Sequence, residues 1–197
     1  MPLPVRKRPI ENSYLVDDLP FAAGEYPGAK PDPRDAGARA KLAQFLDAGV
    51  TAFIDLTHAH DDPLAPYEPI LTALKSERAV DVTYERLTIP DMDVCAPGHM
   101  TRILDAIDRR LAEGRFVYVH CWGGVGRTGT VVGCWLVRQG HDGADALRQV
   151  QRYFSTMHKV RVLRRHPEGS PQTDEQRDMV RTWHHHENGM GWEEVDA

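Results

Sequence analysis

Short apolar runs alternate with amphipathic segments along most of the chain. The runs at 51–56, 83–87 and 116–119 are rich in β-branched or aromatic residues, which is typical of strands. Apolar residues at helical spacing predict helices between and after these strands. The predicted helices cover residues 36–48, 66–78, 100–112, 130–138, 144–154 and 173–185. This alternation predicts an α/β fold, with a central mostly parallel or mixed sheet flanked by helices.

Two features refine this outline. The segment 130–138 is apolar on nearly every face, so we expect it to be a central buried helix. Residues 20–33 are rich in proline and glycine and are expected to lack regular structure, with a short edge strand at 13–16 before them. Prolines and acidic residues predict a loop at 89–98.

Length and composition are those of one globular domain. The chain has 197 residues, 41% hydrophobic and 27% charged, which predicts a single domain over 1–197 with flexible ends at 1–11 and 186–197. The net charge of -5 argues against nucleic-acid binding, and the apolar runs are too short for a membrane span. Three cysteines form no disulfide framework and suit a reducing compartment, so we expect a cytoplasmic protein.

The segment 116–130, FVYVHCWGGVGRTGT, joins a predicted strand to a predicted helix through a glycine-rich loop. Gly123, Gly124 and Gly126 allow the backbone to curl with its N–H groups turned inward, which makes a nest for an anion. The helix N-terminus adds unpaired N–H groups and partial positive charge. Arg127 supplies a planar fork that matches two oxygens of a phosphate. The loop therefore suits a tetrahedral oxyanion.

Cys121 stands at the start of this loop. A free thiol has a pKa of about 8.5, which helix N-termini and neighbouring cations lower to roughly 3.5–7.5. The loop amides and Arg127 would therefore ionise the thiol at neutral pH without a separate general base. The same donors would then hold the oxygens of a phosphoryl group during its transfer.

The run His120-Cys121-x5-Arg127-Thr128 resembles the signature of the protein tyrosine phosphatase superfamily, and the short chain resembles its compact dual-specificity or bacterial-type members. The resemblance implies that Cys121 is the nucleophile and that Arg127 binds phosphate and the transition state. It also implies that the Thr128 hydroxyl steadies the departing thiolate and that His120 positions the loop. Residues expected to line the substrate are Trp122, Gly123, Gly124, Val125, Gly126 and Arg127.

Two further segments are similar to that family. The run 89–93 carries Asp91, which would protonate the leaving oxygen, although Asp93 remains an alternative acid. Near the C-terminus, Gln172 would position the hydrolytic water, with Gln176 nearby.

The resemblance implies hydrolysis of phosphotyrosine and, in a shallow pocket, of phosphoserine and phosphothreonine in proteins, with no cofactor and no metal. One alternative is a phosphatase of phosphoinositides or small phosphate esters, but the loop lacks the lysines that lipid-directed relatives tend to carry. Another is a catalytically silent protein that only binds phosphorylated residues. The match to GxGxxG at 124–129 lacks the second strand and acidic residue of a dinucleotide site.

Several other residues have both a functional and a structural interpretation. Cys95 would pack its loop or form a disulfide with Cys121, and Cys134 is expected in the core. Two groups, interpreted first as a solvated turn and a solvated face, could instead bind a metal and guide an acidic substrate. The first comprises His58, His60, Asp61 and Asp62, and the second comprises Lys159, Arg161, Arg164 and Arg165.

Overall fold

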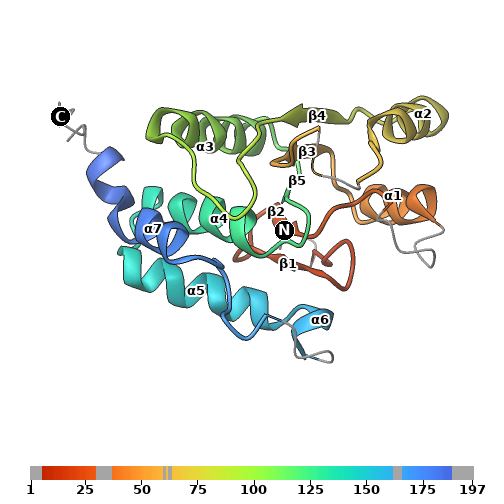
Figure 1. Ribbon diagram of the computed structural model, residues 1–197. Helices are drawn as coiled ribbons and strands as arrows, with labels where there is room; N and C mark the ends of the chain where they lie inside the picture. The colour runs from red at the N-terminus through yellow and green to blue at the C-terminus, as the bar shows by residue number, and fades with distance from the viewer. Residues whose placement is uncertain (1–5, 30–36, 60, 62–63, 162–165, 188–197) are drawn as a thin grey trace.

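A computed structural model describes residues 6–29, 37–59, 61, 64–161 and 166–187. Its described strands form one sheet in the order β1-β2-β5-β3-β4 (Figure 1). β1 runs antiparallel to β2, and every other neighbouring pair is parallel. The strands are β1 (Ser13–Leu15), β2 (Phe21–Gly24), β3 (Ala52–Asp55), β4 (Thr83–Arg86) and β5 (Val117–His120). The predicted α/β class with a mostly parallel mixed sheet is confirmed.

Helices cover both faces of this sheet. Figure 1 shows α1 and α2 on one side and α4, α5 and α7 on the other. The helices are α1 (Ala38–Asp47), α2 (Glu68–Arg78), α3 (Pro97–Ala112), α4 (Gly126–Arg138), α5 (Gly143–Ser155), α6 (His158–Arg161) and α7 (Asp174–Glu187). Within the described residues, no helix has the length and apolar character needed to cross a bilayer.

The central strands are buried along their whole length, because helices shield both faces. Along β5, Val117 and Val119 belong to the core beneath α3, α4, α5 and α7, whereas Tyr118 belongs to the core beneath α1 and α2. Parallel pairing aligns Gly24, Asp55 and His120 at the same level. The loops that follow β2, β3 and β5 therefore leave one edge of the sheet together, where open α/β sheets bind ligands.

The fold differs from the sequence prediction in the proline- and glycine-rich opening. The prediction of irregular structure over 20–33 is wrong at 21–24, where β2 pairs with both β1 and β5. The strand β2 was not predicted because it contains one glycine and two alanines, which have low strand propensity. Close packing requires small residues here, since a Cβ on Gly24 would lie 2.5 Å from the carbonyl oxygen of Asn12. The short helix α6 was also not predicted.

The structure tests the predicted flexibility of the two chain ends only in part. The predicted flexible ends fall partly on residues 1–5 and 188–197, which lie outside the described residues. Closer to the domain, Ile10 is buried in the core beneath α1 and α2, and the Arg8 guanidinium donates to the Thr156 carbonyl at 2.8 Å.

Gly143 sets the spacing between α5 and α7. A Cβ at this position would lie 2.5 Å from the carbonyl oxygen of Arg181 and 2.6 Å from its Cα. We expect Gly143→Ala to lower the free energy of unfolding by about 1–3 kcal/mol, because the two helix backbones must separate. Thermal denaturation of the variant measures this change.

Gly98→Ala is the matched control in α3, since a Cβ there meets nothing within 4 Å. Fewer unfolded conformations should leave this variant as stable as the wild type or stabilise it by about 0.4–1 kcal/mol. Equal melting temperatures for the two variants would show that the α5–α7 contact does not constrain the fold.

Candidate active site

The loop 121–125 connects β5 to α4 and curls against the segment that follows β2. Gly124 has φ 70°, and a Cβ there would lie 2.3 Å from the carbonyl carbon of Gly24, so only glycine fits. A Cβ on Gly126 would meet the Gln176 side chain at 2.8 Å. Gly123 has room for a side chain, with its nearest contact at an ordinary 3.4 Å. Steric constraint thus explains two of the three loop glycines.

The Cys121 sulfur lies buried at the base of this loop. The Gly124 N–H donates to it at 3.3 Å. Burial alone would raise the pKa of the thiol, but the Arg127 guanidinium, the Thr128 hydroxyl and the N–H groups of Thr128 and Gly124 outweigh burial and lower it. Cys121 is therefore disposed to exist as a thiolate.

Arg127 lies at the start of α4 with only 2% of its surface exposed. Its Nη1 donates to the Asp61 carboxylate and, at 3.2 Å, to the Ile89 carbonyl. Its Nη2 pairs with Asp91 Oδ1 at 2.9 Å. The buried Nε has no hydrogen-bond partner among the described residues. Nη1 is thus anchored, while the Nε–Nη2 edge could donate to two oxygens of a phosphate that displaces Asp91 from Nη2.

His120 supports the loop from below. Its Nδ1 lies 3.3 Å from the Cys121 carbonyl oxygen, and its Nε2 lies 2.7 Å from the Tyr67 hydroxyl. Burial lowers the pKa of His120 to about 4, despite Asp55 Oδ1 at 3.9 Å. The ring is therefore neutral at pH 7. Because a carbonyl oxygen can only accept, the ring proton lies on Nδ1, which donates to the Cys121 carbonyl, and Nε2 accepts from the Tyr67 hydroxyl. This geometry fits the loop-positioning role that the family resemblance implies.

The two candidate acids lie in different surroundings. Asp91 contacts Arg127 and lines the pocket above Cys121, with 56% of its side chain exposed. Asp93 Oδ1 instead accepts the Val94 N–H at 2.8 Å, and Asp93 is absent from the described pocket lining. The geometry therefore favours Asp91 as the group that reaches a leaving oxygen.

The two candidate glutamines also differ in their surroundings. Gln172 lines the pocket, whereas Gln176 is fully buried. Gln176 Oε1 accepts the N–H groups of Gln172 at 3.1 Å and Thr173 at 3.2 Å, and its Nε2 donates to the Asp93 carbonyl at 3.0 Å. Gln176 therefore holds the segment that presents Gln172, and it ties that segment to the acidic loop.

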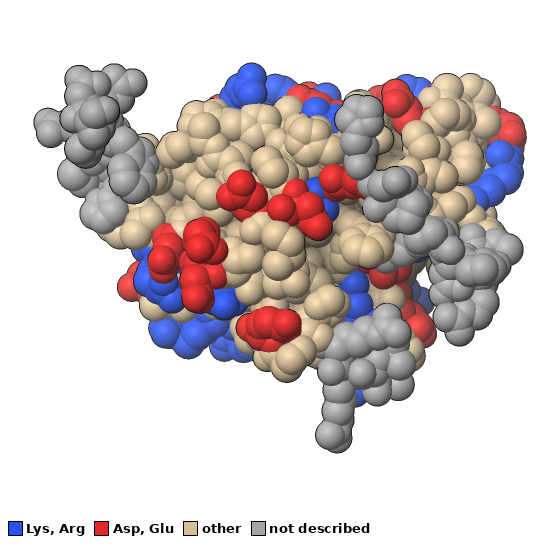
Figure 2. Space-filling model, in the orientation of Figure 1, with Lys and Arg blue, Asp and Glu red and all other residues tan. Residues whose placement is uncertain are grey.

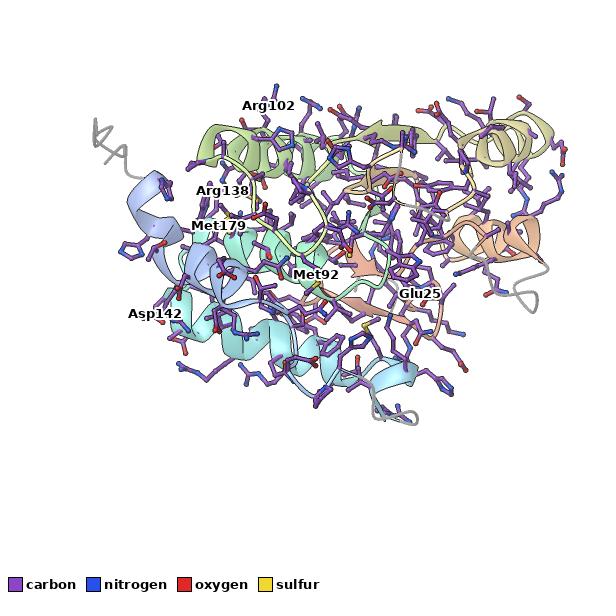
Figure 3. All side chains as sticks on the ribbon, viewed as in Figure 1. Glu25, Met92, Arg102, Arg138, Asp142 and Met179 are labelled. Carbon is purple, nitrogen blue, oxygen red and sulfur yellow. The ribbon has the colours of Figure 1, made fainter. Side chains whose placement is uncertain are left out.

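These groups enclose a pocket of about 130 Å³. Its rim carries Met92 and Trp122, which are 50% and 44% exposed. Figure 3 shows Met92 on the loop before α3, over the start of α4. The described lining comprises Asp91, Met92, Cys121, Trp122, Gly123, Val125, Gly126, Arg127, His166 and Gln172. Sequence reasoning missed Met92, which lies between the two candidate acids but carries no polar group, and His166, which belongs to no recognisable motif.

The solvated-turn interpretation of residues 58–62 is wrong for Asp61, because this carboxylate contacts Arg127 and is only 16% exposed. His58 is exposed, while His60 and Asp62 lie outside the described residues. The described residues contain no group of His, Cys, Asp or Glu that could hold a metal ion. Asp61 was missed because only the fold brings it to Arg127.

The basic run before the glutamine segment is not uniformly solvated. Lys159 is 7% exposed, and its Nζ donates to the Gly123 carbonyl. Arg161 is exposed, whereas Arg164 and Arg165 lie outside the described residues. The solvated-face interpretation is therefore wrong for Lys159.

All three cysteines are free thiols. Cys134 is fully buried in α4, as predicted, and Cys95 is partly buried against the same core. Burial raises the pKa of Cys95 to about 11, in contrast to the lowered pKa of Cys121. The packing interpretation of Cys95 fits these surroundings.

A buried cysteine with a lowered pKa, set among loop amides near a buried arginine and an aspartate, is the arrangement expected of a phosphatase that uses cysteine as its nucleophile. A family model supports this class directly. The model described as "Swiss Army Knife protein, DSP-PTPase phosphatase domain" matches residues 33–180, and the chain belongs to this family. It is therefore a member of a phosphatase family with a compact, dual-specificity-like fold.

Similar proteins agree with this assignment. Phosphatidylglycerophosphate phosphatase PTPMT1 of Arabidopsis thaliana is 32% identical over 114 residues, which are 56% of this chain and 29% of the relative. The chain thus matches less than a third of that relative's length. Two solved structures share the fold. Tk-PTP in its active form has a TM-score of 0.62 at 23% identity, covering 88% of this chain and 96% of that one. PTPMT1 in complex with PI(5)P has a TM-score of 0.65 at 16% identity, covering 91% and 98%.

Asp61 is expected to anchor the guanidinium of Arg127. Asp61→Asn keeps the size of the side chain but removes its charge. We expect kcat/KM for p-nitrophenyl phosphate to fall about tenfold, the equivalent of one charge-assisted hydrogen bond. Steady-state kinetics at constant pH and ionic strength measures the change.

Asp47→Asn is the control, because Asp47 pairs with Arg78 at the surface, 2.6 Å away, and contributes nothing to the pocket. This variant should match the wild type. An Asp61→Asn enzyme with wild-type kcat/KM would show that Arg127 is oriented without Asp61.

Proposed function

We propose that the chain hydrolyses phosphotyrosine, and also phosphoserine and phosphothreonine, in proteins through a cysteinyl-phosphate intermediate. One observation carries this proposal: the Cys121 sulfur lies beneath a pocket whose guanidinium, Arg127, has its buried Nε unpartnered among the described residues. The Nε–Nη2 edge is the natural receptor for two phosphoryl oxygens, provided that the phosphate displaces Asp91 from Nη2.

In the first step, the Cys121 thiolate attacks phosphorus. A sulfur–phosphorus bond forms while the bond to the leaving oxygen breaks. The amides of the loop and Arg127 hold the three equatorial oxygens, where negative charge is spread in the transition state. Asp91, displaced from Arg127 by the phosphate and protonated from solvent, gives that proton to the leaving oxygen, so that an alcohol or phenol departs.

In the second step, water attacks the phosphorus of the cysteinyl phosphate. Asp91, now a carboxylate, takes a proton from this water, and Gln172 at the pocket wall orients it. The phosphorus–sulfur bond breaks, which releases inorganic phosphate and restores the thiolate. The Thr128 hydroxyl, which lowers the pKa of the Cys121 thiol, also stabilises the departing sulfur. A catalytically silent binding role has no support, since cysteine, arginine and aspartate converge in one pocket.

The pocket rim supports a protein substrate over a polyanionic one. Met92 and Trp122 are apolar and exposed at the mouth, where the leaving group must lie. Arg127 is the one Lys or Arg side chain in the described lining. Figure 2 shows acidic residues near the centre of the face viewed in Figure 1, and acidic and basic residues side by side over α5 and α7. An aryl or alkyl group carrying a single phosphate suits this rim.

The relationship to phosphatidylglycerophosphate phosphatase supports a second candidate, hydrolysis of a phosphoinositide or other small phosphate ester. A panel of phosphotyrosyl and phosphothreonyl peptides, phosphatidylglycerophosphate and phosphoinositides decides between the candidates by kcat/KM. Free thiols at all three cysteines suit a reducing compartment, and a cytoplasmic location stays a prediction.

Nucleophile and acid are tested by leaving-group dependence. Cys121→Ser should abolish turnover of every phosphate ester, because the hydroxyl is not ionised at neutral pH. Asp91→Asn should lower kcat by about 10²–10⁴-fold for a phosphothreonyl peptide, whose alkoxide leaves only when protonated. The loss should be much smaller for p-nitrophenyl phosphate, whose leaving group is stable as an anion.

Asp93→Asn is the matched control, since the Asp93 side chain caps Val94 and does not line the described pocket. It should retain the wild-type leaving-group dependence. Turnover of any substrate by Cys121→Ser at the wild-type rate would end the catalytic assignment. A leaving-group effect confined to Asp93→Asn would transfer the acid role to that residue.

A further inference from the structure

Besides the Cys121 carbonyl, which His120 contacts, three carbonyl groups of the loop 121–125 are held by donors from outside it. The Trp122 carbonyl accepts the Tyr26 N–H at 3.0 Å. The Gly123 carbonyl accepts Lys159 Nζ, and the Val125 carbonyl accepts the Ser170 hydroxyl at 2.7 Å. The donors come from three separate segments, which follow β2, begin α6 and precede α7.

A held carbonyl fixes the direction of the next N–H group. The peptide unit is planar and trans, so its C=O and N–H bonds point in opposite directions. When Lys159 holds the Gly123 oxygen away from the pocket, the Gly124 N–H must point into it. The structure shows this result, because that N–H donates to the Cys121 sulfur at 3.3 Å. The Val125 carbonyl accepts both the Ser170 hydroxyl and, at 3.1 Å, the Gly129 N–H of α4, and together these donors impose the same constraint on the unit between Val125 and Gly126.

Lys159 is itself held in place. Its Nζ lies 3.6 Å from Glu25 Oε2, and the other oxygen of Glu25 lies 3.1 Å from Lys41 Nζ. Its backbone N–H donates to Asn12 Oδ1 at 2.9 Å. Figure 3 labels Glu25, which follows β2. A buried ammonium is costly unless it is paired, so the carbonyl and the carboxylate together fix its position.

The orientation of the peptide unit after Gly123 needs this external control, because a glycine restricts backbone rotation least. Gly123 has space around it and no side chain to restrict rotation, so its peptide unit could turn over and aim a carbonyl at the sulfur. Such a turn would put a negative dipole where the thiolate and the phosphate require positive ones. It would also remove the oxygen that Lys159 contacts and leave that ammonium short of a partner.

We propose that Lys159 and Ser170 are positioning residues, which lock the loop amides toward the Cys121 sulfur and the substrate phosphate by holding the Gly123 and Val125 carbonyls outward. Neither residue belongs to the Cys-x5-Arg run. The inference rests on the proposed function, because the amides matter through the thiolate that they stabilise.

The test is the pH dependence of Cys121 alkylation by iodoacetamide, followed by mass spectrometry of the peptide that contains Cys121. Lys159→Met keeps the aliphatic stem but removes the charge and the donor. We expect its alkylation midpoint to rise by about one pH unit, because a stabiliser of the thiolate is lost. We expect kcat for p-nitrophenyl phosphate to fall about 10–100-fold, because the amides are misplaced. Lys159→Arg keeps a cation and should restore part of both.

Arg161→Met is the matched control, since it removes an exposed charge from the same short helix and should match the wild type. Ser170→Ala tests the Val125 carbonyl by a smaller change, and it should raise the midpoint and lower kcat in the same directions. If Lys159→Met shows no cooperative thermal transition and is therefore unfolded, the result for Ser170→Ala decides the proposal.

Three results would overturn the proposal. The first is a folded Lys159→Met with wild-type midpoint and kcat. The second is a raised KM with an unchanged midpoint, which would make Lys159 a substrate contact. The third is a wild-type midpoint and kcat in Ser170→Ala. Alkylation needs no turnover, so a wild-type protein with a low midpoint but no phosphatase activity would contradict the proposed function and leave the positioning role intact.

Discussion

The attraction between the buried Cys121 sulfur and the buried Arg127 guanidinium is the constraint on which the structure depends. Burial disfavours a charge on either group, yet each lowers that cost for the other. Arg127 also needs partners for its remaining N–H groups, which explains why Asp61, Asp91 and the Ile89 carbonyl converge on it. Much of the polar architecture around the pocket satisfies this one buried cation.

The sheet makes that convergence possible. Because β2, β3 and β5 are parallel and in register, the segments that follow them emerge side by side. The segment after β2 packs on Gly124, the segment after β3 carries Asp61, and the segment after β5 is the loop 121–125. The helix α4, buried from Gly126 to Val137, fixes Arg127 at the floor of the site.

Local sequence was sufficient wherever the chemistry is local. The strand, glycines, Cys121 and Arg127 lie within one short segment, and the hydrophobic period placed most helices within a few residues. Contacts between distant segments were beyond reach. Asp61 and Lys159 looked like members of polar surface runs, and only tertiary structure shows them buried against Arg127 and Gly123. The small residues of β2 gave no β-propensity signal, since close packing, which is invisible in one sequence, selects them.

Gln176 links two segments that line the pocket. One carboxamide, fully enclosed by protein, grips the backbone beside Gln172 through its oxygen and the backbone of Asp93 through its nitrogen. Gln176 thereby joins the pocket wall that carries Gln172 to the loop that carries Asp91 and Asp93. Neither segment can shift far without the other, so a substitution that moves one segment would require a compensating substitution in the other.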